Sequence, residues 1–185
     1  MSLDKLTSQL NQSKQDKEKK LPPVESWNPP YCGEIDIKIK VNGDWFHEGT
    51  AFKRMNLVKL FATVLWREVS ENTDEYFLVT PVEKIKISVE DAPFVLTQWR
   101  WQDEKKQTMV LSTNLDEEFI LGKEHPISLN DQGELYVLVR RNLLAKVHRN
   151  VYYQWIDLAE EISTGETTQL VLNSAGNQFV LGSIT

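Results

Sequence analysis

The chain of 185 residues contains a single cysteine, Cys32, so it cannot form a disulfide within itself. This excludes a disulfide-stapled secreted fold, and a lone thiol is compatible with a reducing cytosol. Only 8 glycines and 7 prolines are present, too few for a fibrous or low-complexity protein. At this length, folding hides about 70% of the surface of the unfolded chain, so a core can form without a disulfide or a metal.

Long apolar runs and an excess of positive charge are also missing. A membrane helix needs roughly 18 uninterrupted apolar residues, and the strongest candidate, residues 57–66, is interrupted by Lys59. The first twenty residues carry five lysines and lack the apolar core of a secretory signal. The 21 basic residues face 27 acidic ones, whereas nucleic-acid binding needs a basic face. We expect a cytoplasmic protein that binds neither membranes nor nucleic acid.

The chain opens on a short basic tail and continues into a folded body. Leu3, Leu6 and Leu10 have helical spacing, but a short isolated helix is marginal in water, so we expect residues 1–20 to be a flexible tail. A proline-rich segment follows, and its backbone is restricted to extended conformations. We predict an N-terminal domain over residues 21–95 and a C-terminal, β-rich domain over residues 96–185.

The first domain shows a hairpin, a helix and a second hairpin. Isoleucines and Val41 alternate with polar residues over 35–41, which predicts a half-buried strand. Asn42-Gly43 is the residue pair of a type I′ turn, and the chain returns over 44–47. Apolar residues at helical spacing predict a helix over 56–68, capped by Asn56. Strands at 76–79 and 84–89 complete a ββαββ unit.

The second domain repeats this order after three further strands, predicted at 94–101, 107–112 and 118–121. Trp99 and Trp101 alternate on the first of these, which is typical of core residues. A hairpin at 126–140, a helical face from 151 to 162 and a hairpin at 169–181 make a second ββαββ unit.

The spacing of matching residues favours a duplication. Arg54 follows Gly43 by 11 residues and Arg149 follows Gly133 by 16, so the second copy carries an insertion. We predict an α+β fold of two domains related by duplication, with antiparallel sheets that each carry one main helix.

Several motifs stand out when the chain is read as a whole. They are Trp27-Asn28-Pro29-Pro30-x-Cys32-Gly33-x-Ile35-Asp36, Gly43-x-Trp45-Phe46-x-x-Gly49-Thr50, Leu57-Val58-x-Leu60-Phe61, and Leu78-Val79-Thr80-Pro81-Val82-Glu83-Lys84 with Val89-Glu90-Asp91-x-Pro93-Phe94. Tyr136-Val137-x-Val139-Arg140 and Val151-Tyr152-Tyr153 fit the same pattern. In combination they resemble the bacterial domain-of-unknown-function family 1285 over most of residues 24–185.

The resemblance implies two domains built by duplication, with a C-terminal part superficially like a pleckstrin-homology fold. It also implies a small-ligand site, for instance for a nucleotide, at the interface between the domains. A role in signal transduction is suggested for the family, and no reaction is assigned to it. One departure is Asn142 in place of an expected glycine. Asparagine also tolerates a positive φ, so we expect the turn to be kept.

Basic residues stand immediately before each predicted main helix. A helix N-terminus carries partial positive charge, so a cation there is unfavourable by about 0.3–1 kcal/mol unless an anion compensates. Backbone donors and an arginine fork suit a phosphate or carboxylate, and a tyrosine can stack on a base. The candidate ligand contacts are Arg54, Arg140, Arg141 and Arg149, with Tyr152 as the stacking residue. The alternative is that these arginines are solvated or paired with local acids.

An enzymatic role would need other groups. Cys32 could be a nucleophile only if a cation such as His47 lowered its pKa, and free cysteines are more often packing residues. Two of the carboxylates of Glu83, Glu90 and Asp91 could form an acid–base pair, but no spacing makes them converge. No metal-ligand spacing and no glycine-rich phosphate loop occur, so neither a metal nor a cofactor is expected.

Three functional hypotheses follow from the sequence. The preferred one is a non-enzymatic module that binds a small anionic ligand, for instance of nucleotide type, in the groove between its domains. The second is a protein-interaction adaptor that recruits a partner through the basic tail or an exposed sheet edge. The third is an enzyme that uses Cys32 or the acidic residues.

Overall fold

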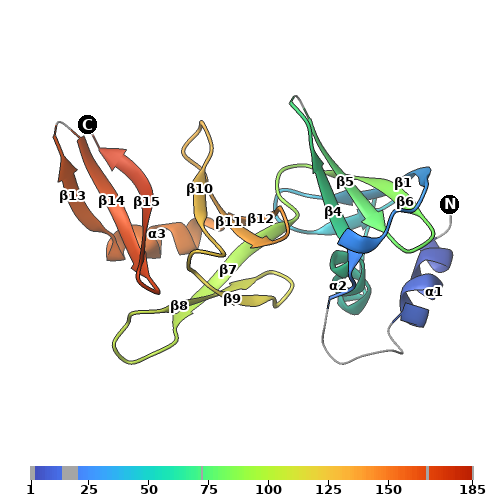
Figure 1. Cartoon of the computed structure of the whole chain (residues 1–185), viewed down its shortest axis with the longest axis horizontal. Coiled ribbons are helices and arrows are strands. Elements are labelled where there is room, and N and C mark those ends of the chain that lie inside the picture. Colours follow the sequence, from blue (N-terminus) through green and yellow to red (C-terminus); the bar gives the residue numbers. More distant parts are fainter. Residues whose placement is uncertain (1–2, 14–20, 72, 166, 185) are drawn as a thin grey trace. The chain divides into compact units, whose positions relative to one another are not determined.

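The computed structural model describes residues 3–13, 21–71, 73–165 and 167–184. The chain folds into two compact units, Met1–Glu90 and Asp91–Thr185 (Figure 1). The predicted boundary, between residues 95 and 96, falls five residues later. Both units combine helices with sheets, so the α+β class is confirmed. Within the described residues, no helix is both long and apolar enough to span a membrane.

Unit 1 is built on one six-stranded sheet in the order β3-β2-β1-β6-β5-β4. The strands are β1 (Tyr31–Ile39), β2 (Trp45–His47), β3 (Thr50–Ala51), β4 (Leu65–Val69), β5 (Asp74–Val79) and β6 (Lys84–Val89). The pair β1–β6 is parallel and the other pairs are antiparallel, so the prediction of purely antiparallel sheets is wrong. Two parallel neighbouring strands need a crossover connection. The connection from β1 to β6 contains α2 (Met55–Thr63).

The first hairpin confirms the predicted strands but not the predicted turn. Ile35, Ile37 and Ile39 are buried on one face of β1, as the alternation predicts. Gly43 has a φ of 84°, while Asn42 does not have a positive φ. The Gly43 N–H donates to the Lys40 carbonyl at 2.8 Å. This is a tight turn followed by one left-handed glycine, where type I′ would need two residues with positive φ.

The helix α2 ends five residues before its predicted end. Its last residue is Thr63, and the chain continues directly as β4, in which Leu65 pairs with Leu78 of β5. Periodicity alone cannot separate the two outcomes, because Val64 and Leu65 fit both a helical face and a buried strand. The ladder with β5 decides in favour of the strand.

An N-terminal helix, α1 (Leu3–Ser13), differs from the expectation of a flexible tail. Leu6 and Leu10 are buried at 0% and 2% exposure, so contacts with unit 1 supply the stability that the isolated helix lacks. Residues 14–20 of the predicted tail lie outside the described residues. A single 3-10 turn, η1 (Val24–Ser26), follows in the proline-rich segment.

Unit 2 contains a six-stranded sheet in the order β10-β11-β12-β7-β8-β9 and a three-stranded sheet, β13-β14-β15. The elements are β7 (Phe94–Trp101), β8 (Met109–Thr113), β9 (Glu118–Ile120), β10 (Ile127–Leu129), β11 (Leu135–Arg140), β12 (Leu143–Val147), α3 (Arg149–Leu158), β13 (Glu160–Thr164), β14 (Thr167–Ser174) and β15 (Asn177–Ile184). The pair β12–β7 is parallel. The helical face predicted to reach residue 162 ends at Leu158, because residues 160–164 pair with β14 instead.

The aromatic residues of unit 2 separate into a buried and a half-buried set. Trp155 of α3 and Phe94 of β7 are both fully buried. Trp99 and Trp101 share one face of β7, as predicted, but they are only half-buried. Their rings form an edge-to-face pair at 5.4 Å, and the Trp99 indole N–H donates to Gln154 Oε1 at 2.7 Å.

Candidate functional site

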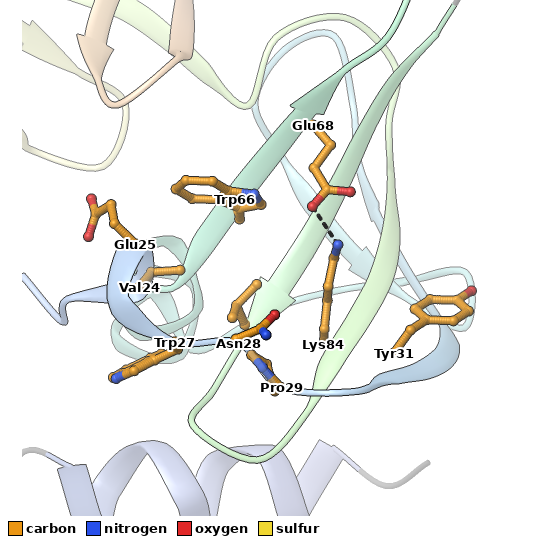
Figure 2. Close-up of a pocket in the computed structure, with 10 residues that line it drawn as sticks. Val24, Glu25, Trp27, Asn28, Pro29, Tyr31, Trp66, Glu68 and Lys84 are labelled. Carbon is orange, nitrogen blue, oxygen red and sulfur yellow. Dashed lines mark hydrogen bonds and ion pairs between the residues drawn. The ribbon is translucent and has the colours of Figure 1, made fainter.

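A pocket of about 260 Å³ opens on unit 1 beside the edge strand β4 (Figure 2). Six of its ten lining residues are apolar or aromatic, and three are charged. The lining residues are Val24, Glu25, Trp27, Asn28, Pro29, Tyr31, Trp66, Glu68, Val79 and Lys84. The proline-rich segment therefore meets the sheet at a concave, aromatic-lined surface.

The proline-rich segment is fixed against the sheet by its own turn and by backbone bonds. Buried Val24 anchors η1, and the Trp27 N–H donates to the Val24 carbonyl at 3.1 Å. The Lys84 N–H donates to the Pro30 carbonyl at 3.0 Å, which ties the end of the segment to β6. The prolines limit the remaining freedom of the backbone. Trp27 and Asn28 are thus held in place at the rim of the pocket.

The opposite wall comes from the sheet. Trp66 and Glu68 are two residues apart on β4, so their side chains project to the same face. Lys84, at the start of β6, points toward Glu68 in Figure 2, and its Nζ lies 2.5 Å from Glu68 Oε1. The same ammonium lies 4.2 Å from the centre of the Phe77 ring. Lys84 is the cation among the lining residues, and it is held by one carboxylate and one ring.

This arrangement suits a flat ligand with a polar group. The half-buried Trp66 ring and the Trp27 ring offer faces for stacking. The Asn28 amide can both donate and accept hydrogen bonds, and Lys84 can only donate. The volume lies just below the range of about 300–1,000 Å³ for drug-sized ligands, so the pocket fits a ligand of one or two rings.

Arg54, the candidate ligand contact of unit 1, lies at the beginning of α2 as predicted. It is the N-cap residue of the helix and is exposed, and its side chain makes no capping hydrogen bond. The predicted cap, Asn56, is the second helical residue. Arg54 lines a different pocket, of about 580 Å³, together with Leu57, Leu60 and residues of α1.

The other arginine candidates near β11 are occupied by local contacts. Arg140 forms an ion pair with Glu117 at 2.9 Å, and its guanidinium lies 4.9 Å from the centre of the Phe94 ring. Burial raises the pKa of Glu117, and the nearby charges of Arg140 and Arg141 oppose that shift. Arg141 carries the positive φ of the turn, at 53°, which we predicted for Asn142.

The start of α3 is already capped by a side chain of the protein itself. The ring Nδ1 of His148 accepts a hydrogen bond from the Asn150 N–H at 3.2 Å, so His148 is the N-cap and Arg149 the first helical residue. Arg54 therefore corresponds in position to His148, one residue before the predicted match. Arg149 is exposed, and half-buried Tyr152 packs edge-to-face on Tyr153 at 5.8 Å. A ligand-contact role for these residues stays a prediction.

The structure does not bring together the groups of the enzymatic alternative. Cys32 is exposed, and its thiol donates to the Pro30 carbonyl at 3.3 Å. His47 pairs with Ile37, five residues further along β1, or about 16 Å away at the usual rise of a strand. In the described part of the chain, no three His, Cys, Asp or Glu side chains gather as metal ligands would.

The three candidate carboxylates each hold a different lysine. Glu83 binds Lys5, Glu90 binds Lys40, and Asp91 binds Lys146. Hydrogen bonding to Lys40 lowers the pKa of Glu90. Because Glu90 belongs to unit 1 and Asp91 to unit 2, the two neighbours in sequence serve separate units.

Asp91 belongs to a polar cluster on unit 2 that the sequence did not reveal. Lys146 Nζ donates to Asp91 at 2.7 Å and to Glu134 at 2.6 Å, and the Tyr136 hydroxyl donates to Asp91 at 2.8 Å. The hydrogen bond from Lys146 lowers the pKa of Glu134. Burial alone would lower the pKa of Lys146, but its two carboxylate partners raise it. Burial and the hydrogen bond to Asp91 raise the pKa of Tyr136. The cluster is internally satisfied and is structural.

The aromatic pocket was not predicted as a site. In the sequence Trp27 stands out only as part of a motif, while Trp66 falls in the predicted helix and Lys84 in a predicted strand. The usable signal was the alternation of Trp66 and Glu68, which places both on one face of a strand once residues 65–69 are known to be extended.

Comparison with known proteins places the chain in a class of two-domain α+β proteins. The N-terminal domain of the domain-of-unknown-function family DUF1285 matches residues 22–92, and the C-terminal domain of the DUF1285 proteins of unknown function matches residues 93–181. The chain therefore belongs to the DUF1285 family, and the resemblance seen in the sequence is confirmed.

Two solved structures support this assignment. A DUF1285 family protein from Silicibacter pomeroyi DSS-3 is 34% identical, with a TM-score of 0.77 over 95% of each chain. One from Shewanella baltica OS155 is 29% identical, with a TM-score of 0.52 over 65% of this chain and 90% of the other. No curated protein matches the chain.

Proposed function

We propose that the protein is a non-enzymatic module that binds a small planar ligand carrying an anionic group, of nucleotide type, in the aromatic pocket of unit 1. The observation that carries the proposal is that Trp27, Trp66 and Lys84, from three separate segments, line one concave surface. A large half-buried ring beside a cation is the pairing that a base with a phosphate requires.

Stacking supplies the first part of the affinity. Base–aromatic stacking contributes about 1–3 kcal/mol per base. Trp66 stands on an edge strand, so one side of its ring is not covered by a further strand of the sheet. Pro29 and Val79 complete an apolar wall, and Asn28 offers a donor and an acceptor to the edge of the base.

The positive charge of Lys84 supplies the second part of the affinity. It is now paired with Glu68, whose side chain is 46% exposed and can turn toward solvent. A phosphate carries more negative charge than a carboxylate and accepts more hydrogen bonds, so it competes with Glu68 for the ammonium. Ligand binding then exchanges one ion pair for another and leaves Glu68 hydrated.

The proposal is tested by titrating the protein with nucleoside monophosphates and with the matching free nucleosides, followed by tryptophan fluorescence. Replacing Trp66 with leucine should weaken binding of both ligand sets by about 5–150-fold, the equivalent of one lost stacking contact. Replacing Lys84 with methionine should weaken binding of the monophosphates by about 10-fold and leave that of the nucleosides unchanged.

Matched controls are available in the same chain. Lys86, two residues along β6, is also ion-paired, with Glu75 at 2.7 Å, but does not line the pocket. Half-buried Trp101 of unit 2 is the control for Trp66. Lys86→Met and Trp101→Leu should bind like the parent protein. Equal losses in the controls, or no saturable binding of any monophosphate, would contradict the proposal.

We also infer that the two units arose by duplication. Each contains three antiparallel strands, a helix and three more antiparallel strands, from β1 to β6 and from β10 to β15. The hairpins begin with the same turn, since Gly133 donates to Asn130 as Gly43 donates to Lys40. The longer strands β11 and β12 account for the extra residues of the second copy. The pleckstrin-homology likeness, the ligand groove between the domains, the cytoplasmic location and a signalling role stay predictions.

A further inference from the structure

The helix α1 is attached to unit 1 through one small surface. Leu6 and Leu10, four residues apart on the same helical face, are buried. Lys5 Nζ donates to Glu83 Oε1 at 2.5 Å, and the Thr80 hydroxyl donates to Gln9 Oε1 at 3.2 Å. Both polar contacts are made to the turn between β5 and β6, against which α1 lies in Figure 1. We call the surface that α1 covers, with Thr80 and Glu83 as its polar contacts, the helix-docking surface.

The packing of α1 is incomplete along the flank of its docked face. Leu3, Asp4 and Thr7 line the pocket of about 580 Å³ that separates α1 from the first turns of α2. An isolated helix of eleven residues is marginal in water, so α1 depends on its docked face for stability. A helix that is held on one face and open along the flank of that face belongs to the low-stability part of a structure.

Glu83, the buried carboxylate of this surface, has within the described part of the chain a hydrogen bond to only one of its two oxygens. Glu83 has a side-chain exposure of 9%, and its Oε2 is buried without a hydrogen-bond partner among the described residues. A buried carboxylate oxygen without a donor is costly. Lys5 presents a point charge and reaches one oxygen, whereas an arginine fork donates to both oxygens of a carboxylate at once. α1 is therefore a weaker occupant than the surface allows.

We propose that the helix-docking surface is a binding site for an amphipathic helix of a partner protein, in which an arginine precedes a leucine and a second leucine follows four residues later. The arginine takes both oxygens of Glu83, and the leucines replace Leu6 and Leu10. In the absence of the partner, α1 occupies the surface and competes with it. This inference is independent of the ligand pocket.

The test uses two labelled synthetic peptides with the sequence of residues 1–13, one native and one carrying K5R. Both are titrated by fluorescence anisotropy against the full chain and against the full chain with Leu6→Asp, which releases α1. The released chain should bind each peptide at least 10-fold more tightly than the parent chain. It should also bind the K5R peptide about 5–10-fold more tightly than the native peptide.

Two further variants show whether Glu83 is responsible. Adding Glu83→Gln to the released chain should abolish the preference for the K5R peptide, whereas Glu90→Gln, at a carboxylate that holds Lys40, should preserve it. The absence of peptide binding to the released chain, or a preference that survives Glu83→Gln, overturns the proposal.

A measurement on the full chain covers the case in which Leu6→Asp does not fold. Lys5→Arg should slow amide hydrogen exchange over residues 3–13 by 3-fold or more relative to the parent, because both oxygens of Glu83 are then bonded. Unchanged or faster exchange in this segment overturns the proposal.

Discussion

At the scale of single residues, several charged side chains of this protein form ion pairs, for example Arg67 with Asp74 of the neighbouring strand. The cluster of Lys146, Asp91, Glu134 and Tyr136 is the most connected example, and each of its hydrogen bonds lies inside unit 2. Such a network stabilises the unit only while all its members keep their charge states.

Replacing Lys146 with methionine should lower the free energy of unfolding of unit 2 by about 1 kcal/mol at pH 7, since the cluster is partly exposed and screened. The pKa of Glu134 is lowered in the folded state, so its contribution is present above its unfolded pKa of about 4.3 and is lost as the pH falls through its folded pKa. The difference between variant and parent should therefore shrink below about pH 4.5. Urea unfolding followed by circular dichroism measures it, and a difference that does not shrink as the pH falls from 7 to 3 would contradict this account.

Arg54 is a poor residue for the place it occupies. It is the N-cap of α2, its side chain caps nothing, and the first turn contains no acidic residue. Replacing it with serine should raise the free energy of unfolding by about 1 kcal/mol, because a hydroxyl satisfies one free N–H and the unfavourable charge is removed. Lys53→Ser is the control, and thermal unfolding measures both. A stability unchanged or lower in Arg54→Ser would refute the prediction.

At the scale of elements, short turns fix the hairpins. The β14–β15 hairpin turns on two residues, Ala175 with φ 48° and Gly176 with φ 74°, between the paired Ser174 and Asn177. This is the conformation in which asparagine followed by glycine is preferred.

Replacing Ala175 with asparagine should stabilise unit 2 by about 0.5–1 kcal/mol, because asparagine tolerates the left-handed region better than alanine. Valine at the same position should destabilise it, since a β-branched side chain is strained at positive φ. Denaturant midpoints of the three proteins measure the order, and an order other than asparagine, alanine, valine would be evidence against the turn.

The elements predicted correctly from the sequence are those whose pattern lies within a few consecutive residues. The alternation in β1, the position of the turn at Gly43 and strand β7 were predicted correctly, although the type of that turn was not. The end of α2 was missed because Val64 fits both a helix and a strand, and only the pairing with β5 decides between them. The pocket was missed for the same reason, since Trp66 and Lys84 meet only through the strand order of the sheet.

At the scale of the whole molecule, each unit carries its own sheets. Every strand pairing among the described residues joins two strands of the same unit. Phe61 is fully buried in unit 1, and its replacement by alanine should cost about 3–5 kcal/mol there. Amide exchange should become faster over residues 31–89 and stay unchanged over residues 94–181. Equal loss of protection in both ranges would show that the units unfold as one.

We expect the aromatic pocket of unit 1 to bind a planar anionic ligand, and the indole N–H signals of the six tryptophans test this expectation most directly. In two-dimensional NMR spectra assigned by single substitutions, a nucleoside monophosphate should shift the signals of Trp27 and Trp66 in a saturable way. The signals of Trp99, Trp101 and Trp155 in unit 2 should stay in place. Saturable shifts confined to unit 2, or no shift at Trp66 at any concentration of monophosphate, would contradict the account.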